Sequence, residues 1–153
     1  MNRKIFLLAC VTGGFGVMLG AFAAHGLKPL LSISAFESFN TGIRYQIYHA
    51  FLLFFIGGST QLKPRQKSIL FKLISTGLLL FSGSIYLLST NDLTSFNFKV
   101  IGLITPVGGL FLIASWMLLF TYFFRIFNYK SSAEILQDSS QFLNFSCISI
   151  SAV

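Results

Sequence analysis

Four long apolar runs decide what this chain of 153 residues can fold into. They cover residues 5–24, 45–62, 69–89 and 100–124. A helix needs about 20 mostly apolar residues to cross the hydrocarbon core of a bilayer, because each residue adds about 1.5 Å along its axis. A barrel strand would need only about 10 residues, with strict alternation of apolar and polar side chains. The sequence therefore predicts an all-α fold, an integral membrane four-helix bundle.

The composition agrees with these runs. Hydrophobic residues make up 54% of the chain and charged residues only 10%, which leaves too little polar surface to cover a soluble domain of this size. We expect residues 1–125 to form one transmembrane domain. Residues 126–153 are rich in serine and weakly periodic, so we expect a loosely ordered cytoplasmic tail, in which the alternation over 144–151 is compatible with a strand.

The cationic residues are unevenly distributed. With four crossings, both termini share one side of the membrane with the loop between the second and third runs, and that side carries eight of the eleven Lys and Arg residues. Such an excess in short loops marks the cytoplasmic side, so both termini are expected there. The net charge of +7 is then a topology signal. Because no recognition motif accompanies it, nucleic acid is not an expected partner.

Small residues in the first and fourth runs indicate close helix packing. Five glycines are the candidates: Gly13, Gly16, Gly20, Gly108 and Gly109. Gly16 and Gly20 form a GxxxG pattern, which lets another helix approach closely in lipid. Besides the lipid bilayer itself, we therefore expect a second copy of the chain or another membrane protein as a partner.

Six further residues are candidates for a polar or ligand-binding site near the outer face: His25, Gln46, His49, Ser84, Tyr86 and Pro106. Counting about 1.5 Å per residue inward places His49, Ser84 and Pro106 at similar depths of about 6 to 9 Å. One interpretation is a polar cavity, with His25 and His49 as proton acceptors or metal ligands. The other is packing, in which His49 and Gln46 tie helices together. Ser84 or Tyr86 would then bond a carbonyl that Pro106 leaves without a donor.

The start of one helix is predicted ahead of the second run. Ser34 and Glu37 have the spacing of a capping box, in which each side chain accepts a hydrogen bond from the other's backbone N–H. We expect a helix to begin there and to enter the membrane near Tyr45.

The sequence offers little for catalysis. It has no Ser/His/Asp arrangement, no carboxylate pair within the runs and no phosphate-binding loop. Its two histidines fall short of the three or four ligands that zinc takes. We expect neither an enzyme nor a resident metal or cofactor, and keep a metal-handling role for His25 and His49 only as a third alternative.

Four motifs occur in an order that resembles a known family. They are residues 20–27 (GAFAAHGL), 45–50 (YQIYHA), 81–86 (FSGSIY) and 105–109 (TPVGG). The set is similar to the small uncharacterised membrane proteins of the UPF0382 or DUF423 type, to which the eukaryotic transmembrane protein 256 group is related. The resemblance covers residues 5–124. It implies a four-helix protein of the plasma membrane, the inner membrane in bacteria, and no established activity.

Two functions remain open at this point. The leading interpretation is a multi-pass membrane protein of unknown molecular function that is non-enzymatic and associates through helix packing. The alternative is a small transporter or channel subunit with a polar site near the outer face. It would have to be oligomeric, because four short helices are too few to enclose a sizeable aqueous path.

Overall fold

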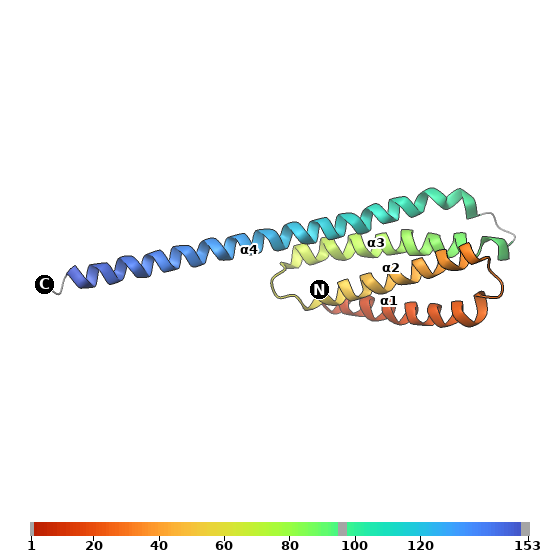
Figure 1. Cartoon of the computed structure of the whole chain (residues 1–153), viewed down its shortest axis with the longest axis horizontal. Helices are drawn as coiled ribbons and strands as arrows, with labels where there is room; N and C mark the ends of the chain where they lie inside the picture. The colour runs from red at the N-terminus through yellow and green to blue at the C-terminus, as the bar shows by residue number, and fades with distance from the viewer. Residues whose placement is uncertain (1, 95–97, 151–153) are drawn as a thin grey trace. The chain divides into compact units, whose positions relative to one another are not determined.

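The computed structural model describes the backbone of residues 2–94 and 98–150, and the side chains of residues 2–94 and 101–129. Its elements, in chain order, are α1 (Asn2–Phe22), the π-helix η1 (Ala23–Leu27), α2 (Ile33–Gly58), α3 (Pro64–Ser89), the 3-10 helices η2 (Asn91–Leu93) and η3 (Phe98–Leu103), and α4 (Ile104–Ile150) (Figure 1). Every regular element in these ranges is helical, which confirms the all-α prediction. The chain divides into two compact units, Met1–Leu118 and Leu119–Val153.

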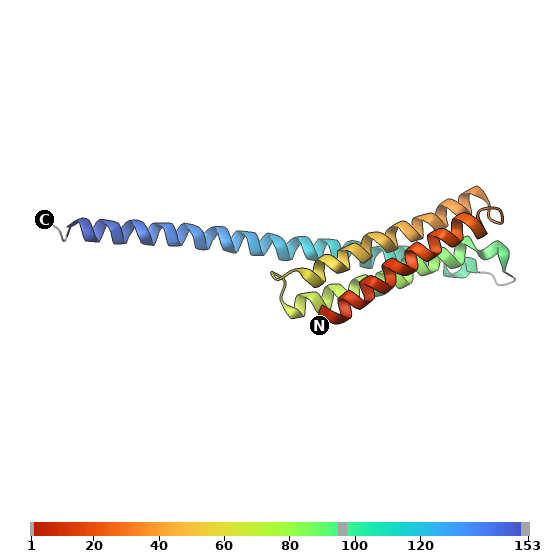
Figure 2. The same cartoon turned by 90° about the horizontal axis from the view of Figure 1, so that it is seen from below.

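In the first unit, α2 packs against both α1 and α3 (Figures 1 and 2). Short loops join these helices, so that neighbours run antiparallel. The beginning of α4 packs on α3 at glycines: a Cβ added at Gly77 would lie 2.6 Å from Leu112 Cδ2. One added at Gly108 would overlap the backbone of Leu80 and Phe81. Four helices thus form one bundle, as predicted, and small residues set the closest helix contacts.

The helix boundaries differ from the predicted ones in two places. α2 begins at Ile33, and its N-cap is Ser32, whose hydroxyl accepts a hydrogen bond from Ala35 N at 3.3 Å. The capping box expected at Ser34 is therefore wrong by two residues. Pro106 lies in the first turn of α4, after the 3-10 segment. It causes no break there, because the first N–H groups of a helix have no intrahelical acceptor in any case.

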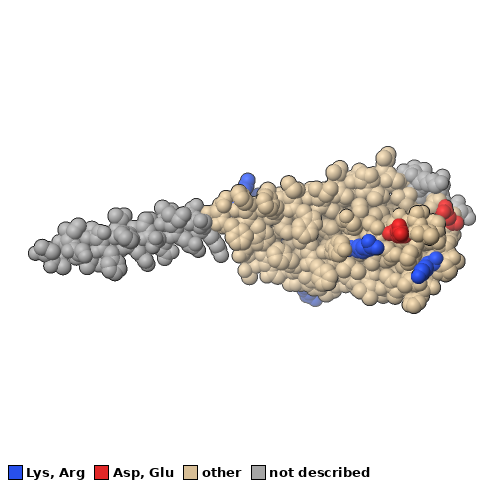
Figure 3. Space-filling model, in the orientation of Figure 1, with Lys and Arg blue, Asp and Glu red and all other residues tan. Residues whose placement is uncertain are grey.

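The surface of the first unit is apolar. Large hydrophobic side chains are exposed on every long helix, for example Leu79 at 75% and Phe51 at 68%. Charged side chains are sparse on the face that Figure 3 shows. Within the described part of the chain, three helical segments are long and apolar enough to cross a membrane: Asn2–Leu27, Pro64–Ser89 and Ile101–Tyr129. This surface is the one expected of a protein surrounded by lipid.

The second predicted crossing does not reach that apolarity. Its helix, α2, is 26 residues long, but it carries Arg44, Gln46 and His49 within its middle. Gln46 and His49 are buried between helices, so their cost in lipid is reduced.

In the second unit, α4 continues as a helix through Ile150. The backbone of residues 144–150 is helical, so the strand considered for residues 144–151 is not found there. No Gly or Pro follows Gly109, and nothing in the sequence therefore breaks this helix. Its first turns stack aromatic rings four residues apart, Phe120 on Phe124 with centroids separated by 5.9 Å.

Candidate functional site

Gln46 connects three helices of the first unit. Its Nε2 donates a hydrogen bond to the carbonyl oxygen of Thr12 on α1 at 2.7 Å, and its Oε1 accepts one from the Tyr86 hydroxyl on α3 at 2.8 Å. Gln46 is buried on α2. One turn away, the Ser82 hydroxyl donates to the carbonyl oxygen of Gly42 at 3.0 Å, which adds a second bond between α3 and α2. In a low-dielectric interior such bonds hold the helices in one register.

His49 connects α2 to α4. Its Nδ1 lies 2.7 Å from the carbonyl oxygen of Tyr45, and Trp116 Nε1 donates to its Nε2 at 3.3 Å. A carbonyl can only accept and an indole N–H can only donate, so these partners assign the proton to Nδ1. Both ring nitrogens are thereby occupied in a neutral imidazole.

Ser84 links α3 to the start of α4. Its hydroxyl lies 2.7 Å from the Thr105 hydroxyl and also reaches the carbonyl oxygen of Phe81 at 3.0 Å. The structure therefore brings Ser84 next to the residue that precedes Pro106. It does not gather all six candidates into one cavity: His25 is exposed on the π-helix η1, and His49 makes its own link through Trp116.

The described part of the chain contains no group of three or more His, Cys, Asp and Glu side chains placed to hold a metal ion. The sequence pointed to Gln46, His49, Ser84 and Tyr86 but not to their partners. These partners are the Thr12 carbonyl, Thr105 and Trp116. Ser82, which donates to the Gly42 carbonyl, was missed as well. Spacing could have found Ser82, because it precedes Tyr86 by four residues and so shares its helix face.

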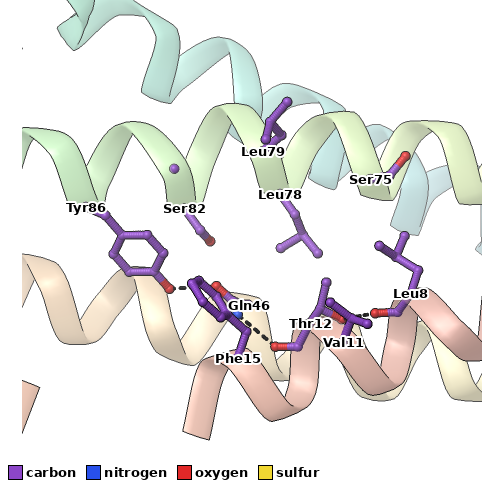
Figure 4. A pocket seen from close by; sticks show the side chains of 11 residues that line it. Leu8, Val11, Thr12, Phe15, Gln46, Ser75, Leu78, Leu79, Ser82 and Tyr86 are labelled. Atoms are coloured by element: carbon purple, nitrogen blue, oxygen red, sulfur yellow. Dashed lines mark hydrogen bonds between the residues drawn. The ribbon is translucent and has the colours of Figure 1, made fainter. Parts of the chain in front are cut away.

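A groove opens between α1 and α3 beside Gln46 (Figure 4). Its volume is about 280 Å³. Apolar side chains form most of its wall: Leu8, Val11 and Phe15 from α1, and Leu78 and Leu79 from α3. Polar groups line it at Thr12, Ser75, Gln46, Ser82 and Tyr86. The hydrogen bonds of Gln46 cross this polar part, as the dashed lines in Figure 4 show.

The candidate packing glycines occupy different environments. A Cβ at Gly16 would lie 2.9 Å from Ile47 Cγ1, and one at Gly13 would lie 3.6 Å from Ala50, so both glycines face α2 of the same chain. A Cβ at Gly20 would meet nothing within 4 Å. Gly108 lies against the α3 backbone, whereas a Cβ at Gly109 would make only ordinary contact with the Phe81 ring, at 3.6 Å.

The fold and this site define a class: a small multi-pass α-helical membrane protein whose buried polar side chains join its helices. Comparison with known proteins narrows the class. The model of the family described as a protein of unknown function (DUF423) matches residues 19–109. The chain belongs to this family, whose curated members are called UPF0382 membrane proteins, and the resemblance drawn from the four motifs is confirmed.

Three bacterial relatives match the chain over most of their length. The UPF0382 membrane protein of Haemophilus influenzae is 34% identical over 117 residues, covering 76% of this chain and 90% of the relative. YwdK of Bacillus subtilis is 34% identical over 119 residues, covering 76% and 93%. The inner membrane protein YgdD of Escherichia coli is 32% identical over 122 residues, covering 77% and 87%. No solved structure matches the chain.

Proposed function

We propose that this membrane protein is non-enzymatic and acts by packing against a second copy of itself in the bilayer. One observation carries the non-enzymatic part: Gln46, His49, Ser84 and Tyr86 all have hydrogen-bond partners within the bundle. Among the buried side-chain nitrogen and oxygen atoms of the described residues, only the Ser89 hydroxyl lacks a hydrogen-bond partner. A general base or nucleophile needs a free electron pair facing its substrate, and the imidazole of His49 has both nitrogens engaged.

We do not assign the groove between α1 and α3 to the second copy, because polar groups that line it are already bonded within the chain: Gln46 binds the Thr12 carbonyl and the Tyr86 hydroxyl across it. The GxxxG glycine Gly16 is not available either, because it faces Ile47.

The outward face of α1 suits a partner helix better. Cys10, Gly14, Val17 and Ala21 are exposed and recur at steps of three and four residues, so they share one face. A Cβ at Gly14 would meet nothing within 4 Å. Small residues on a lipid-facing surface allow two helices to approach closely. This matters in a bilayer, because van der Waals packing rather than the hydrophobic effect drives helix association there. We therefore assign the dimer contact to this face.

Cys10 makes the proposal testable without adding a probe. In a symmetric dimer the two copies of Cys10 would face each other, since a two-fold interface pairs the same patch. In a Cys147→Ser background, a membrane-permeable oxidant should produce a disulfide-linked dimer, and Gly14→Leu should reduce its yield several-fold while leaving the fold intact. The control carries Cys10→Ser, Cys147→Ser and Phe51→Cys, because Phe51 is also exposed but lies on α2. Equal dimer yields from Cys10 and Phe51→Cys would contradict the proposal.

The groove supports a second candidate function, a small oligomeric transporter or channel subunit. Polar groups of Thr12, Gln46, Ser82 and Tyr86 line it, and a transported solute would need such groups in contact with water. Ser82→Cys, in a protein without Cys10 and Cys147, tests this directly. Labelling from outside the cell by an impermeant thiol reagent would favour transport. Protection, with Ser34→Cys at the exposed start of α2 labelled as the positive control, would favour packing.

The location and orientation are part of the proposal. We propose that the protein lies in the plasma membrane, the inner membrane in bacteria, with both termini in the cytoplasm, because cationic residues gather at the end that holds the N-terminus and the α2–α3 loop. A reporter that is active only in the cytoplasm should be active when it is fused to the C-terminus. Activity of a reporter that folds only outside the cytoplasm would reverse the orientation.

A further inference from the structure

Lys67 is a buried cation at one end of the bundle. It lies one turn into α3 and is only 5% exposed. Its ammonium donates to the carbonyl oxygen of Gly57, in the last turn of α2, at 3.1 Å, and to Oδ1 of Asn2 on α1 at 3.2 Å. Both acceptors are neutral. Since an ammonium has three donors, these bonds leave one N–H of Lys67 for another acceptor.

Among the described side chains, no carboxylate lies at the same end of the bundle as this charge. Within the described side chains the acidic residues are Glu37 and Asp92, and both lie at the other end, near the α1–α2 loop and just after α3 (Figure 1). The end that holds Lys67 carries further cations instead: Arg3, Lys4, Lys63, Arg65 and Lys72. Burying a charge is costly unless an opposite charge or strong hydrogen bonds offset it. Lys67 is thus held by neutral acceptors, with no described carboxylate beside it.

A polar cavity of about 610 Å³ adjoins Lys67. Besides Lys67, its lining includes Arg3 and Asn2 from α1, Ser59 and Thr60 from the α2–α3 loop, and Pro64 at the start of α3. Two cations and two hydroxyl groups thus face one space. The first turn of α3 adds the partial positive charge of a helix N-terminus.

We infer that this cavity binds a phosphate group, with the headgroup of an anionic phospholipid as its source. Arginine and lysine together suit phosphate, because the guanidinium can bind two oxygens while the ammonium supplies a compact charge. The site lies at the ends of membrane-crossing helices, where headgroups lie. In the orientation proposed above this end faces the cytoplasmic leaflet, in which anionic lipids are enriched. The inference does not depend on the proposed dimer, which uses a different face of α1.

The test uses the full chain, purified in a non-ionic detergent, and follows thermal unfolding through the fluorescence of its single tryptophan. Short-chain phosphatidylglycerol should raise the unfolding midpoint in a dose-dependent manner, and short-chain phosphatidylcholine should do so less, because Arg3 repels its ammonium. Lys67→Gln should raise the half-maximal phosphatidylglycerol concentration by at least about tenfold, as one charge-assisted hydrogen bond is lost. Lys67→Arg should keep most of the effect.

Two variants separate a specific site from general surface charge. Lys72→Gln removes the same charge from an exposed position on the same helix, away from the cavity, and should leave the half-maximal concentration unchanged. Arg3 is exposed and also lines the cavity, so Arg3→Gln should fold and should weaken binding even if Lys67→Gln proves unable to fold. The site would be overturned if Lys72→Gln weakened phosphatidylglycerol binding as much as Lys67→Gln does, or as much as Arg3→Gln does. An equal midpoint shift with inorganic phosphate alone would overturn the lipid source and assign the site to a soluble phosphate.

Discussion

The two adjacent glycines of α4 give the sharpest test of the packing between α3 and α4. We predict that Gly108→Ala destabilises the protein relative to Gly109→Ala. A Cβ at Gly108 would lie 2.8 Å from both Leu80 C and Phe81 Cα, and closer still to Phe81 N. These are backbone atoms of α3, which cannot rotate away. A Cβ at Gly109 would meet the Phe81 ring at 3.6 Å, an ordinary van der Waals distance.

The magnitude follows from comparing the two variants with each other. Both replace glycine within the same helix, so both gain a similar helix propensity, about 0.8 to 1 kcal/mol in soluble hosts. That gain cancels in the difference. What remains is the cost of forcing a methyl group into a filled space, about 1 to 3 kcal/mol. Gly108→Ala should therefore be less stable than Gly109→Ala by about that amount.

Trp116 provides the assay, since it is the only tryptophan and its indole contacts His49 on α2. Titration of detergent-solubilised protein with sodium dodecyl sulfate should separate α4 from the bundle and change this fluorescence. The midpoint for Gly108→Ala should lie clearly below that for Gly109→Ala. Equal midpoints would refute the close approach of α4 to α3 at this position.

Two further predictions concern α2. A double-mutant cycle between Gln46→Leu and Tyr86→Phe should give a coupling energy of about 0.5 to 1.5 kcal/mol, because both variants remove the same 2.8 Å hydrogen bond; additive effects would show that this bond contributes nothing. Ser32→Ala should cost about 1 kcal/mol and speed amide exchange in the first turn of α2, whereas Ser34→Ala should have a smaller effect. The opposite ranking would restore Ser34 as the cap.

The sequence was sufficient for the four helices of the first unit but only partly for their contacts, and it did not predict that α4 continues through Ile150. Apolar runs predicted four helices, since length and hydropathy are local properties that a bilayer selects strongly. The partner of Gln46 on α1 is a backbone carbonyl, that of Thr12, which every residue type would supply. No sequence pattern can single out such an acceptor. Likewise, GxxxG predicts that a helix approaches closely, but not whether that helix belongs to the same chain.

Lys67 shows a different limit. Counted as one of several basic residues in a cytoplasmic loop, it served only to orient the chain. Its spacing to Leu70, Ile74 and Gly77 follows the buried face of α3, so the helix period itself carried the information that this lysine is buried. Charge counting and periodicity had to be applied to the same residue to reveal a buried cation.

The low apolarity of α2 and its position in the bundle have one cause. α2 contacts α1 and α3 along its length and reaches α4 through His49, so much of its surface faces protein rather than lipid. A helix shielded in this way can carry Gln46 and His49, provided that each finds a partner. The same polar residues that lower its hydropathy make the bonds that fix its neighbours. The bundle is thus organised around the helix that carries these buried polar side chains, and substitutions there should disturb several helix contacts at once.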